Sequence, residues 1–350
     1  MKNKKILLIL SMFLILTLAA SIGCAAPAEE TPVVVPDAPE ESFDLKFAIP
    51  VNVGDDFTNF WQAWADDIAA ASNGRINITV YMGGTLGKAT EQLEMLKTGV
   101  ADIVYHVPPW TPGAFPLAEA ASLPYLTATP TSIYFYGNYL MQWDKVKEFD
   151  AYKPLEFGSS PSGLLFFTDK KVTTLEEMKG LKMRAAGPIG KTMETLGASS
   201  VPTPTVDVYM ALERSTVDGI AIDAGALSGM KGYEVVKYGI ANPLYLGTHM
   251  VIMSKATWES MPADLQLVMS EFTKGHQLRW LEFVIDWDQS AVKLMEDNGV
   301  EMYFLAPDEA ERWKALLAPE IDQYIAAKGA EGLPAAEAIA AAKKFTHYEK

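Results

Sequence analysis

One arginine lies where a strand pattern changes into a helix pattern. In Leu181–Ala186 (LKMRAA) apolar and polar residues alternate, which indicates a half-buried strand with Arg184 on its more polar side. Gly187–Gly190 (GPIG) ends that strand, and Lys191–Leu196 follows a helical pattern. Backbone N–H groups at a helix start and a guanidinium both favour an anion. We therefore expect Arg184 to bind an acidic ligand; an arginine on a solvated strand edge is the alternative.

Asp223 is a second polar candidate, because it ends the apolar strand pattern Gly219–Asp223. A carboxylate at this point could accept a hydrogen bond from a ligand hydroxyl or amine, or help to hold a cation. It could equally cap a helix that begins near Ala226, since Asp is a favoured capping residue. The sequence leaves these alternatives open.

Three short motifs are the strongest sign of an enzyme, because penicillin-binding proteins use the same three for Ser-dependent acyl transfer. They are Ser228–Lys231 (S-x-x-K), Tyr136–Asn138 (Y-x-N) and Lys97–Gly99 (K-T-G). Their order in this chain is the reverse of the order in those enzymes. Motifs this short also arise often by chance, so we expect no catalysis.

Metal and cofactor sites are not expected either. The four histidines, at positions 106, 249, 276 and 347, show no HxxH or HExxH spacing, and Cys24 is the one cysteine. The sequence contains no P-loop and no G-x-G-x-x-G motif.

The segments that must position these residues alternate between strand and helix patterns. This alternation predicts an α/β fold with a mostly parallel sheet and helices outside it. The expected strands are 43–50, 76–81, 102–106, 164–168, 181–186, 219–223 and 250–254. The expected helices include 91–97, 188–196, 207–214 and 227–236, and a proline-free helical pattern runs from Ala263 to Asn298.

The N-terminal segment is expected to direct and tether the protein. Residues 1–23 form a predicted signal peptide, since lysines precede an apolar run, Ile6–Ala20, that is shorter than the about 20 residues of a membrane helix. Ser21–Cys24 resembles a lipoprotein box, so Cys24 is predicted to be lipidated. Residues 24–42 are rich in Pro, Ala and Glu, which predicts an extended lipidated tether that holds a domain off a membrane.

Charge and length limit the class of protein. The formal charge is −15, and removal of residues 1–23 with their three lysines makes it −18. Such an acidic chain does not favour nucleic acid as a partner, and an anionic ligand needs a local pocket. The 327 residues that then remain of 350 are enough for two domains.

Several ordered motifs, including the segment around Arg184, resemble a known family. The segments LKMRAAG (181–187) and DVYMALERSTVDG (207–219) are similar to the phrases LxGLKxRxP and EVYxALQxGxVDG of the DctP-type solute-binding proteins of tripartite (TRAP) transporters. Asn73–Ile103 resembles a motif of the first half of that family. Weaker matches occur at Ser122–Leu126, Thr248–Ser254 and Trp258–Gln266, so the resemblance covers about residues 43–325.

The resemblance implies a two-lobed fold of the periplasmic-binding-protein (Venus flytrap) type, with a long helix that spans both lobes and a ligand in the cleft between them. We assign residues 43–163 and 250–285 to the first lobe, and 164–249 and 286–350 to the second. The implied function is that of an extracytoplasmic solute receptor, which delivers a small organic acid to the small and large integral membrane subunits of a TRAP transporter. A receptor that senses a ligand and signals to a kinase is the alternative.

The resemblance also implies roles for single residues. Arg184 matches the arginine that pairs with the substrate carboxylate, and Glu91 matches an acid that supports this arginine or the water network of the ligand. The candidates for lining the cleft are Phe57, Trp61, Trp110 and Tyr209, with Asn59 and His106 as weaker ones. Each of these could instead be an ordinary packing residue, since large aromatic side chains mostly pack in cores.

Two family features are missing from this sequence. Gly163–Asp169 lacks the second arginine that the family often has, and Asp218–Gly225 (DGIAIDAG) lacks the asparagine of the phrase DGxxNP. A second carboxylate of a ligand would then have no partner. The sequence therefore predicts a ligand with one carboxylate and an apolar body.

Overall fold

The computed structural model describes residues 41–51, 54–185 and 187–347. The predicted signal peptide, residues 1–23, the lipidation site Cys24 and nearly all of the predicted tether lie outside these residues. None of the described helices has both the length and the hydropathy that a membrane crossing requires.

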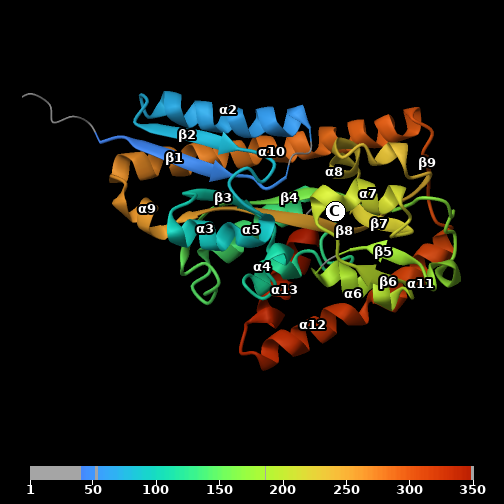
Figure 1. The fold of residues 1–350 in the computed structure, drawn as a ribbon. Helices are drawn as coiled ribbons and strands as arrows, with labels where there is room; N and C mark the ends of the chain where they lie inside the picture. The colour runs from blue at the N-terminus through green and yellow to red at the C-terminus, as the bar shows by residue number, and fades with distance from the viewer. Residues whose placement is uncertain (1–40, 52–53, 186, 348–350) are drawn as a thin grey trace, which may run out of the picture. The chain divides into compact units, whose positions relative to one another are not determined.

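A mixed sheet lies at the centre of the described chain (Figure 1). Its strands are β1 (Phe43–Ala48), β2 (Ile76–Tyr81), β3 (Ile103–His106), β4 (Tyr152–Phe167), β5 (Lys182–Arg184), β6 (Ser199–Val201), β7 (Gly219–Asp223), β8 (Tyr238–Ser254) and β9 (Glu301–Tyr303). Their hydrogen-bonded order is β2-β1-β3-β8-β4-β7-β5-β6, and β9 pairs with β8. The outer pairs are parallel, but β3–β8, β4–β8 and β4–β7 are antiparallel. The prediction of a mostly parallel sheet is therefore wrong for its centre.

Two long strands join the halves of this sheet. β4 has 16 residues and β8 has 17, and they pair from Tyr152 opposite Ser254 to Phe167 opposite Tyr238. The sequence pattern predicted only one end of each, because glycines, prolines and register shifts interrupt the alternation elsewhere. These strands are the structural link between the two lobes.

The helices cover both faces of the sheet. They are α2 (Asp55–Ala71), α3 (Gln92–Thr98), α4 (Pro116–Ala120), α5 (Pro130–Gln142), α6 (Gly187–Thr195), α7 (Val208–Glu213), α8 (Ala224–Gly229), α9 (Lys255–Ser260), α10 (Ala263–Asp297), α11 (Pro307–Leu317), α12 (Pro319–Ala330) and α13 (Ala335–His347). A short 3₁₀ helix, η2 (Pro108–Trp110), follows β3. The helix predicted at 227–236 begins earlier, at Ala224, because Asp223 caps it.

Four buried apolar clusters divide these elements into two lobes. In the first lobe, one cluster packs α2 on β1, β2 and β3, and another packs α3, α4 and α5 on the opposite face. In the second lobe, one cluster packs α6 and α11 on β5 and β7, and another packs α7 and α8 on β7. The structure therefore has the two-lobed α/β architecture that the sequence predicts.

The helix α10 contributes to both lobes. Met269 and Trp280 pack in the cluster of α2, whereas Ala291 and Met295 pack in the cluster of α7 and α8. Figure 1 shows α10 passing from the neighbourhood of α9 to that of β9. Its bounds, Ala263–Asp297, confirm the predicted long helix to within one residue.

The C-terminal helices do not stay on the second lobe. Trp313 and Leu317 of α11 pack in the cluster of α6, but Ala338 and Ile339 of α13 pack in the cluster of α4 and α5. The assignment of all of 286–350 to the second lobe is therefore wrong for α13, whose alanine-rich stripe is buried on the first. The remaining lobe boundaries stay a prediction.

Candidate functional site

Arg184 is held in place by a backbone carbonyl and has no counter-ion in the described part of the chain. It ends β5, where it pairs in register with Val201 of β6 and Ile220 of β7. Its Nε and Nη2 both donate to the Thr203 carbonyl, at 3.1 and 2.9 Å. Burial lowers the pKa of the guanidinium, which still remains charged at neutral pH. Among the described residues it forms no ion pair, so it is a cation that is held by the Thr203 carbonyl and has no acidic partner there.

The chain directly after Arg184 touches the first lobe. A Cβ on Gly187, whose φ is +57°, would lie 2.8 Å from Cβ of Pro109 and 3.1 Å from Oε1 of Glu119. Pro109 belongs to η2 together with Trp110, whose half-buried ring lies 6.2 Å from that of Tyr105. The start of α6 and the loop with Trp110 are therefore neighbours across the two lobes.

Tyr245 lies near enough to Arg184 and Asp223 for both of their charges to act on it. Gly163 of β4 pairs with Tyr245 on one side and with Asp223 on the other. The ring of Tyr245 covers this glycine, since a Cβ on Gly163 would lie 2.2 Å from Cε1 of the ring. Burial raises the pKa of Tyr245, Asp223 raises it further and Arg184 opposes the shift. The tyrosine thus experiences both charges.

Two acidic side chains lie at the inner end of this group. Asp223 caps α8, because its Oδ1 accepts a hydrogen bond of 2.7 Å from the Ala226 N–H. Burial, together with the charge of Asp288, raises the pKa of Asp223 to about 7. Burial also raises the pKa of Asp288, on α10, to about 6, although a hydrogen bond from the Ser162 backbone opposes this. Both carboxylates are therefore in a poorly hydrated place.

Aromatic rings form the wall next to these carboxylates. The ring of Phe57 lies 5.7 Å from that of Tyr105 and 5.9 Å from that of Trp287. Trp287 packs against the start of α8, since a Cβ on Gly225 would lie 2.7 Å from Cε2 of the indole. Phe57 is itself buried, so the half-buried Trp110 and Trp287 are the rings that would favour a flat or apolar ligand body.

The structure brings only some of the predicted site residues together. The charges of Arg184 and Asp223 both act on Tyr245, and Trp110 is on the loop that lies beside the start of α6. Phe57 and Trp61 are core residues, with 2% and 0% of their surface exposed. They pack as the bulky face of α2, which is the ordinary role of such rings.

His106 is also a core residue. It is fully buried, and its Nδ1 lies 3.0 Å from Oε1 of Gln92. Burial lowers its pKa to about 3, so it is neutral. The expectation that His106 lines the cleft is not supported by this placement.

Glu91, Tyr209 and Asn59 lie on the surface of the described chain. Glu91 is exposed and accepts a hydrogen bond of 2.9 Å from the Lys88 N–H in a capping box. The hydroxyl of Tyr209 donates to Glu234 at 2.9 Å. Asn59 is exposed on α2. None of the three contacts Arg184, and for Glu91 the local cap explains the acid.

Sequence reasoning missed Tyr105, Tyr245, Trp287 and Asp288. One signal could have identified Asp288: it falls at helical spacing among the buried residues Val284 and Ala291 of α10. An acidic residue in a buried stripe needs a reason. Tyr245 gave no comparable signal, because its position depends on the pairing of β4 with β8.

The motifs of the acyl-transfer alternative are not brought together. Ser228 is on α8 in the second lobe, where its hydroxyl donates to the Gly225 carbonyl. Tyr136 is buried in the first lobe and donates to the Leu117 carbonyl. Lys97 is exposed on α3 and pairs with Glu94. The residues described by the structure also contain no group of three or more His, Cys, Asp or Glu that could hold a metal ion.

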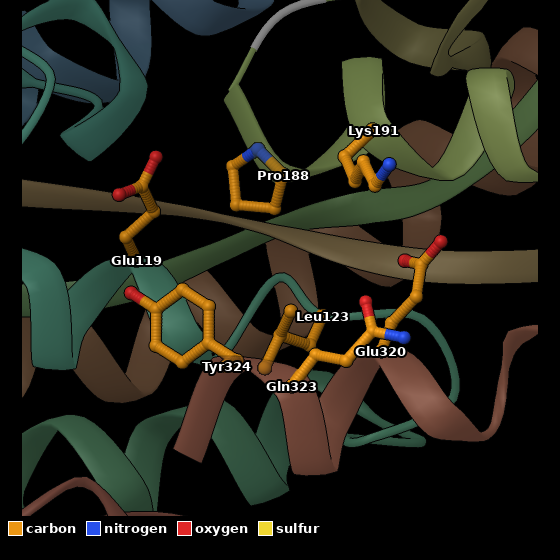
Figure 2. A pocket seen from close by; sticks show the side chains of 7 residues that line it. All are labelled: Glu119, Leu123, Pro188, Lys191, Glu320, Gln323 and Tyr324. Atoms are coloured by element: carbon orange, nitrogen blue, oxygen red, sulfur yellow. The ribbon is translucent and has the colours of Figure 1, made fainter. Parts of the chain in front are cut away.

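An open pocket of about 290 Å³ lies elsewhere, between α6 and α12 (Figure 2). It is lined by Glu119, Leu123, Pro188, Lys191, Glu320, Gln323 and Tyr324. Glu320 accepts a hydrogen bond from Thr192 of α6, and Tyr324 donates one to the Pro116 carbonyl of α4. The pocket has two carboxylates and one lysine, a balance that does not favour an organic acid.

The matching family profile and a relative that is similar over most of this chain both describe solute-binding proteins. The sequence profile of bacterial extracellular solute-binding protein, family 7 (DctP), matches residues 51–328. The C4-dicarboxylate-binding periplasmic protein DctP of Rhodobacter capsulatus is 26% identical over an alignment of 350 residues, which covers 92% of this chain and 96% of the relative.

Two solved structures share the fold over most of the chain. A TRAP solute-binding protein from a marine metagenome, specific for aromatic acid ligands and co-crystallised with 3-hydroxybenzoate, has 25% identity and a TM-score of 0.82, over 87% of this chain and 98% of that one. A TRAP solute-binding protein from Rhodoferax ferrireducens, in complex with copurified benzoate, has 24% identity and a TM-score of 0.81, with the same coverage of both chains.

Proposed function

The chain belongs to family 7 (DctP) of the bacterial extracellular solute-binding proteins, and on this premise we propose that it is the solute receptor of a TRAP transporter and binds an organic monocarboxylate at Arg184. The relatives and structural neighbours are solute-binding proteins, not enzymes. The proposed role is therefore to capture a solute and deliver it to two integral membrane subunits, without catalysis.

The observation that carries this proposal is the unpaired Arg184. A partly buried guanidinium without a counter-ion among the described residues is poorly solvated, and a carboxylate ligand would stabilise it through charge-assisted hydrogen bonds. The Thr203 carbonyl fixes the orientation of the group at 2.9 and 3.1 Å before the ligand arrives. Such preorganisation increases affinity, because less freedom is lost on binding.

One carboxylate fits the charges of the site better than two. Arg184 is the one cation that the described residues contribute beside Tyr245, whereas Asp223 and Asp288 are acidic. A second ligand carboxylate would meet these acids instead of a partner. The name of the Rhodobacter relative indicates a dicarboxylate and the metagenome neighbour is specific for aromatic acids. The charges and the aromatic wall of this chain favour the second type of ligand.

We expect monocarboxylates with an apolar body to bind more tightly than C4-dicarboxylates. Like charges that face each other in a desolvated site cost several kcal/mol, so the difference should be at least about tenfold in Kd. A thermal-shift screen of carboxylates on residues 43–350, followed by calorimetry, measures it. A C4-dicarboxylate that binds more tightly than every monocarboxylate tested would refute the single-carboxylate site.

The proposed location is the outer face of a membrane, reached by a lipid on Cys24. Cys24 is the one cysteine of the chain and follows a run of small residues. We expect Cys24→Ser to move the protein from the membrane fraction to the soluble fraction on cell fractionation, while Ser21→Ala leaves it with the membranes. Mass spectrometry of the wild-type N-terminus checks the cause; an N-terminus without lipid mass would remove this part of the proposal.

A further inference from the structure

The acid pair Asp223 and Asp288 has unused hydrogen-bonding capacity inside the molecule. Oδ1 of Asp288 is enclosed and has no partner among the described residues. Asp223 accepts a hydrogen bond from the Ala226 N–H through Oδ1, and it also interacts with its own backbone N–H. The chain neighbour of Asp288, Trp287, packs against Gly225 at the start of α8, which Asp223 caps, and the charge of Asp288 acts on Asp223. Backbone hydrogen bonds therefore account for part of each carboxyl group, and Oδ1 of Asp288 is left without a partner among the described residues.

The side chains that surround Asp223 and Asp288 on the neighbouring strands are mostly aromatic, and one of them is a further carboxylate. Tyr105 of β3 is 7% exposed, its hydroxyl has no hydrogen-bond partner in the described chain, and its pKa is raised by burial, by Asp223 and by Glu156 of β4. Tyr245 of β8 also experiences the charge of Asp223. Arg184 of β5 acts on Tyr245 but forms no ion pair with either aspartate.

No described side chain therefore neutralises the pair, and a simple carboxylate ligand would not do so either. Such a ligand would form an ion pair with Arg184 and would place its own negative charge near the two aspartates. A cation would instead compensate the charge of both carboxylates. Trp287 and Tyr105, which line the same place, add a favourable surface for a cation.

We propose that Asp223 and Asp288 bind an ammonium group of the solute while Arg184 binds its carboxylate, so that the ligand is an amino-bearing monocarboxylate. This inference rests on the proposed function and names the class of its substrate. A ligand hydroxyl could donate to one oxygen, but it would leave the charge of the pair uncompensated. An ammonium donates up to three hydrogen bonds and matches both carboxylates.

The test uses matched acids that differ in one group. The probes are 3-(aminomethyl)benzoate, 3-(hydroxymethyl)benzoate and 3-ethylbenzoate, and a second pair is L-phenylalanine and 3-phenylpropanoate. Calorimetric titration of residues 43–350 should give at least about tenfold tighter binding for the amino member of one of these sets. Asp288→Asn should remove most of that preference. Asp286→Asn, at an exposed position of the same helix, should keep it.

Proton exchange gives an independent readout. At pH 6.5 the pair is partly protonated, and a bound ammonium favours the charged carboxylates, so amino probes should release protons. Amino-free acids should take protons up. Titrations in phosphate and in imidazole buffer, which differ in ionisation enthalpy, give the number of protons exchanged.

The outcomes separate this inference from the proposed function. If the hydroxyl or amino-free member of each set binds as tightly as the amino member, or if amino probes take up protons, the ammonium site is refuted while an acid receptor remains. If no acid in the thermal-shift screen stabilises the protein, the proposed function fails, and the ammonium site fails with it.

Discussion

Replacing Arg184 by alanine should abolish measurable binding of a carboxylate at micromolar concentration and leave the fold intact. Loss of one partner from a desolvated charge pair costs about 2 to 5 kcal/mol of binding free energy. The unliganded protein should not lose stability, because Arg184 is a half-buried cation whose described hydrogen bonds go to a single carbonyl, that of Thr203. Calorimetric titration and the melting curve of the apo protein measure the two effects.

Arg184→Lys should restore binding only weakly. An ammonium keeps the charge but cannot make two parallel hydrogen bonds to a carboxylate. Arg214→Ala is the matched control, because Arg214 is exposed in the same lobe. Near-wild-type affinity in Arg184→Ala, or a collapsed melting temperature without ligand, would assign Arg184 a structural role instead.

Glu156→Ala should cause the largest loss of stability among these substitutions, about 3 to 5 kcal/mol of unfolding free energy, because it removes the carboxylate that lies within hydrogen-bonding distance of two buried histidines. Glu156 of β4 is fully buried and lies 3.3 Å from Nε2 of His249 on β8 and 3.0 Å from Nδ1 of His276 on α10. It thus connects three elements that link the lobes. Urea denaturation measures the loss.

Glu156→Gln should cost less, about 1 to 3 kcal/mol, since the amide keeps the shape and one acceptor. Glu282→Ala, at an exposed position of α10, should change stability by less than about 0.5 kcal/mol. A loss below about 1 kcal/mol for Glu156→Ala would show that this carboxylate does not connect these elements energetically.

The stabilisation that Glu156 provides should weaken as the pH falls. Burial alone would raise the pKa of Glu156, but His276 and His249 outweigh it and lower the pKa from 4.5 to about 2. A depressed folded pKa means that the stabilisation is present above the unfolded value and is lost as the pH falls from about 4.5 towards 2. The stability difference between wild type and Glu156→Gln should therefore shrink in this range.

Local patterns predicted the elements that depend on local forces. The bounds of β2 and β7 agree with the expected 76–81 and 219–223, because simple alternation or an apolar run defines them. The strand before Arg184 and the helix after it were also predicted, because the glycines between them mark the change. The position of Arg184 at the end of a strand and just before a helix follows from these two elements.

Long-range pairing limited the remaining predictions. The two strands that join the lobes contain prolines and bulges, so their full lengths depend on each other and not on their own sequences. For the same reason Tyr245 could not be identified. Phe57 and Trp61 were considered as cleft residues because aromatic side chains serve both cores and pockets, and only packing distinguishes the two roles.

A crystal structure with a bound acid tests the central claim most directly. The ligand should be the monocarboxylate that stabilises residues 43–350 most in the thermal-shift screen. We expect its carboxylate within about 2.7 to 3.0 Å of guanidinium nitrogens of Arg184, with its body against Trp110 and Trp287. An acid bound elsewhere, for example beside Lys191 in the pocket of Figure 2, with Arg184 still bonded only to Thr203, would contradict the account.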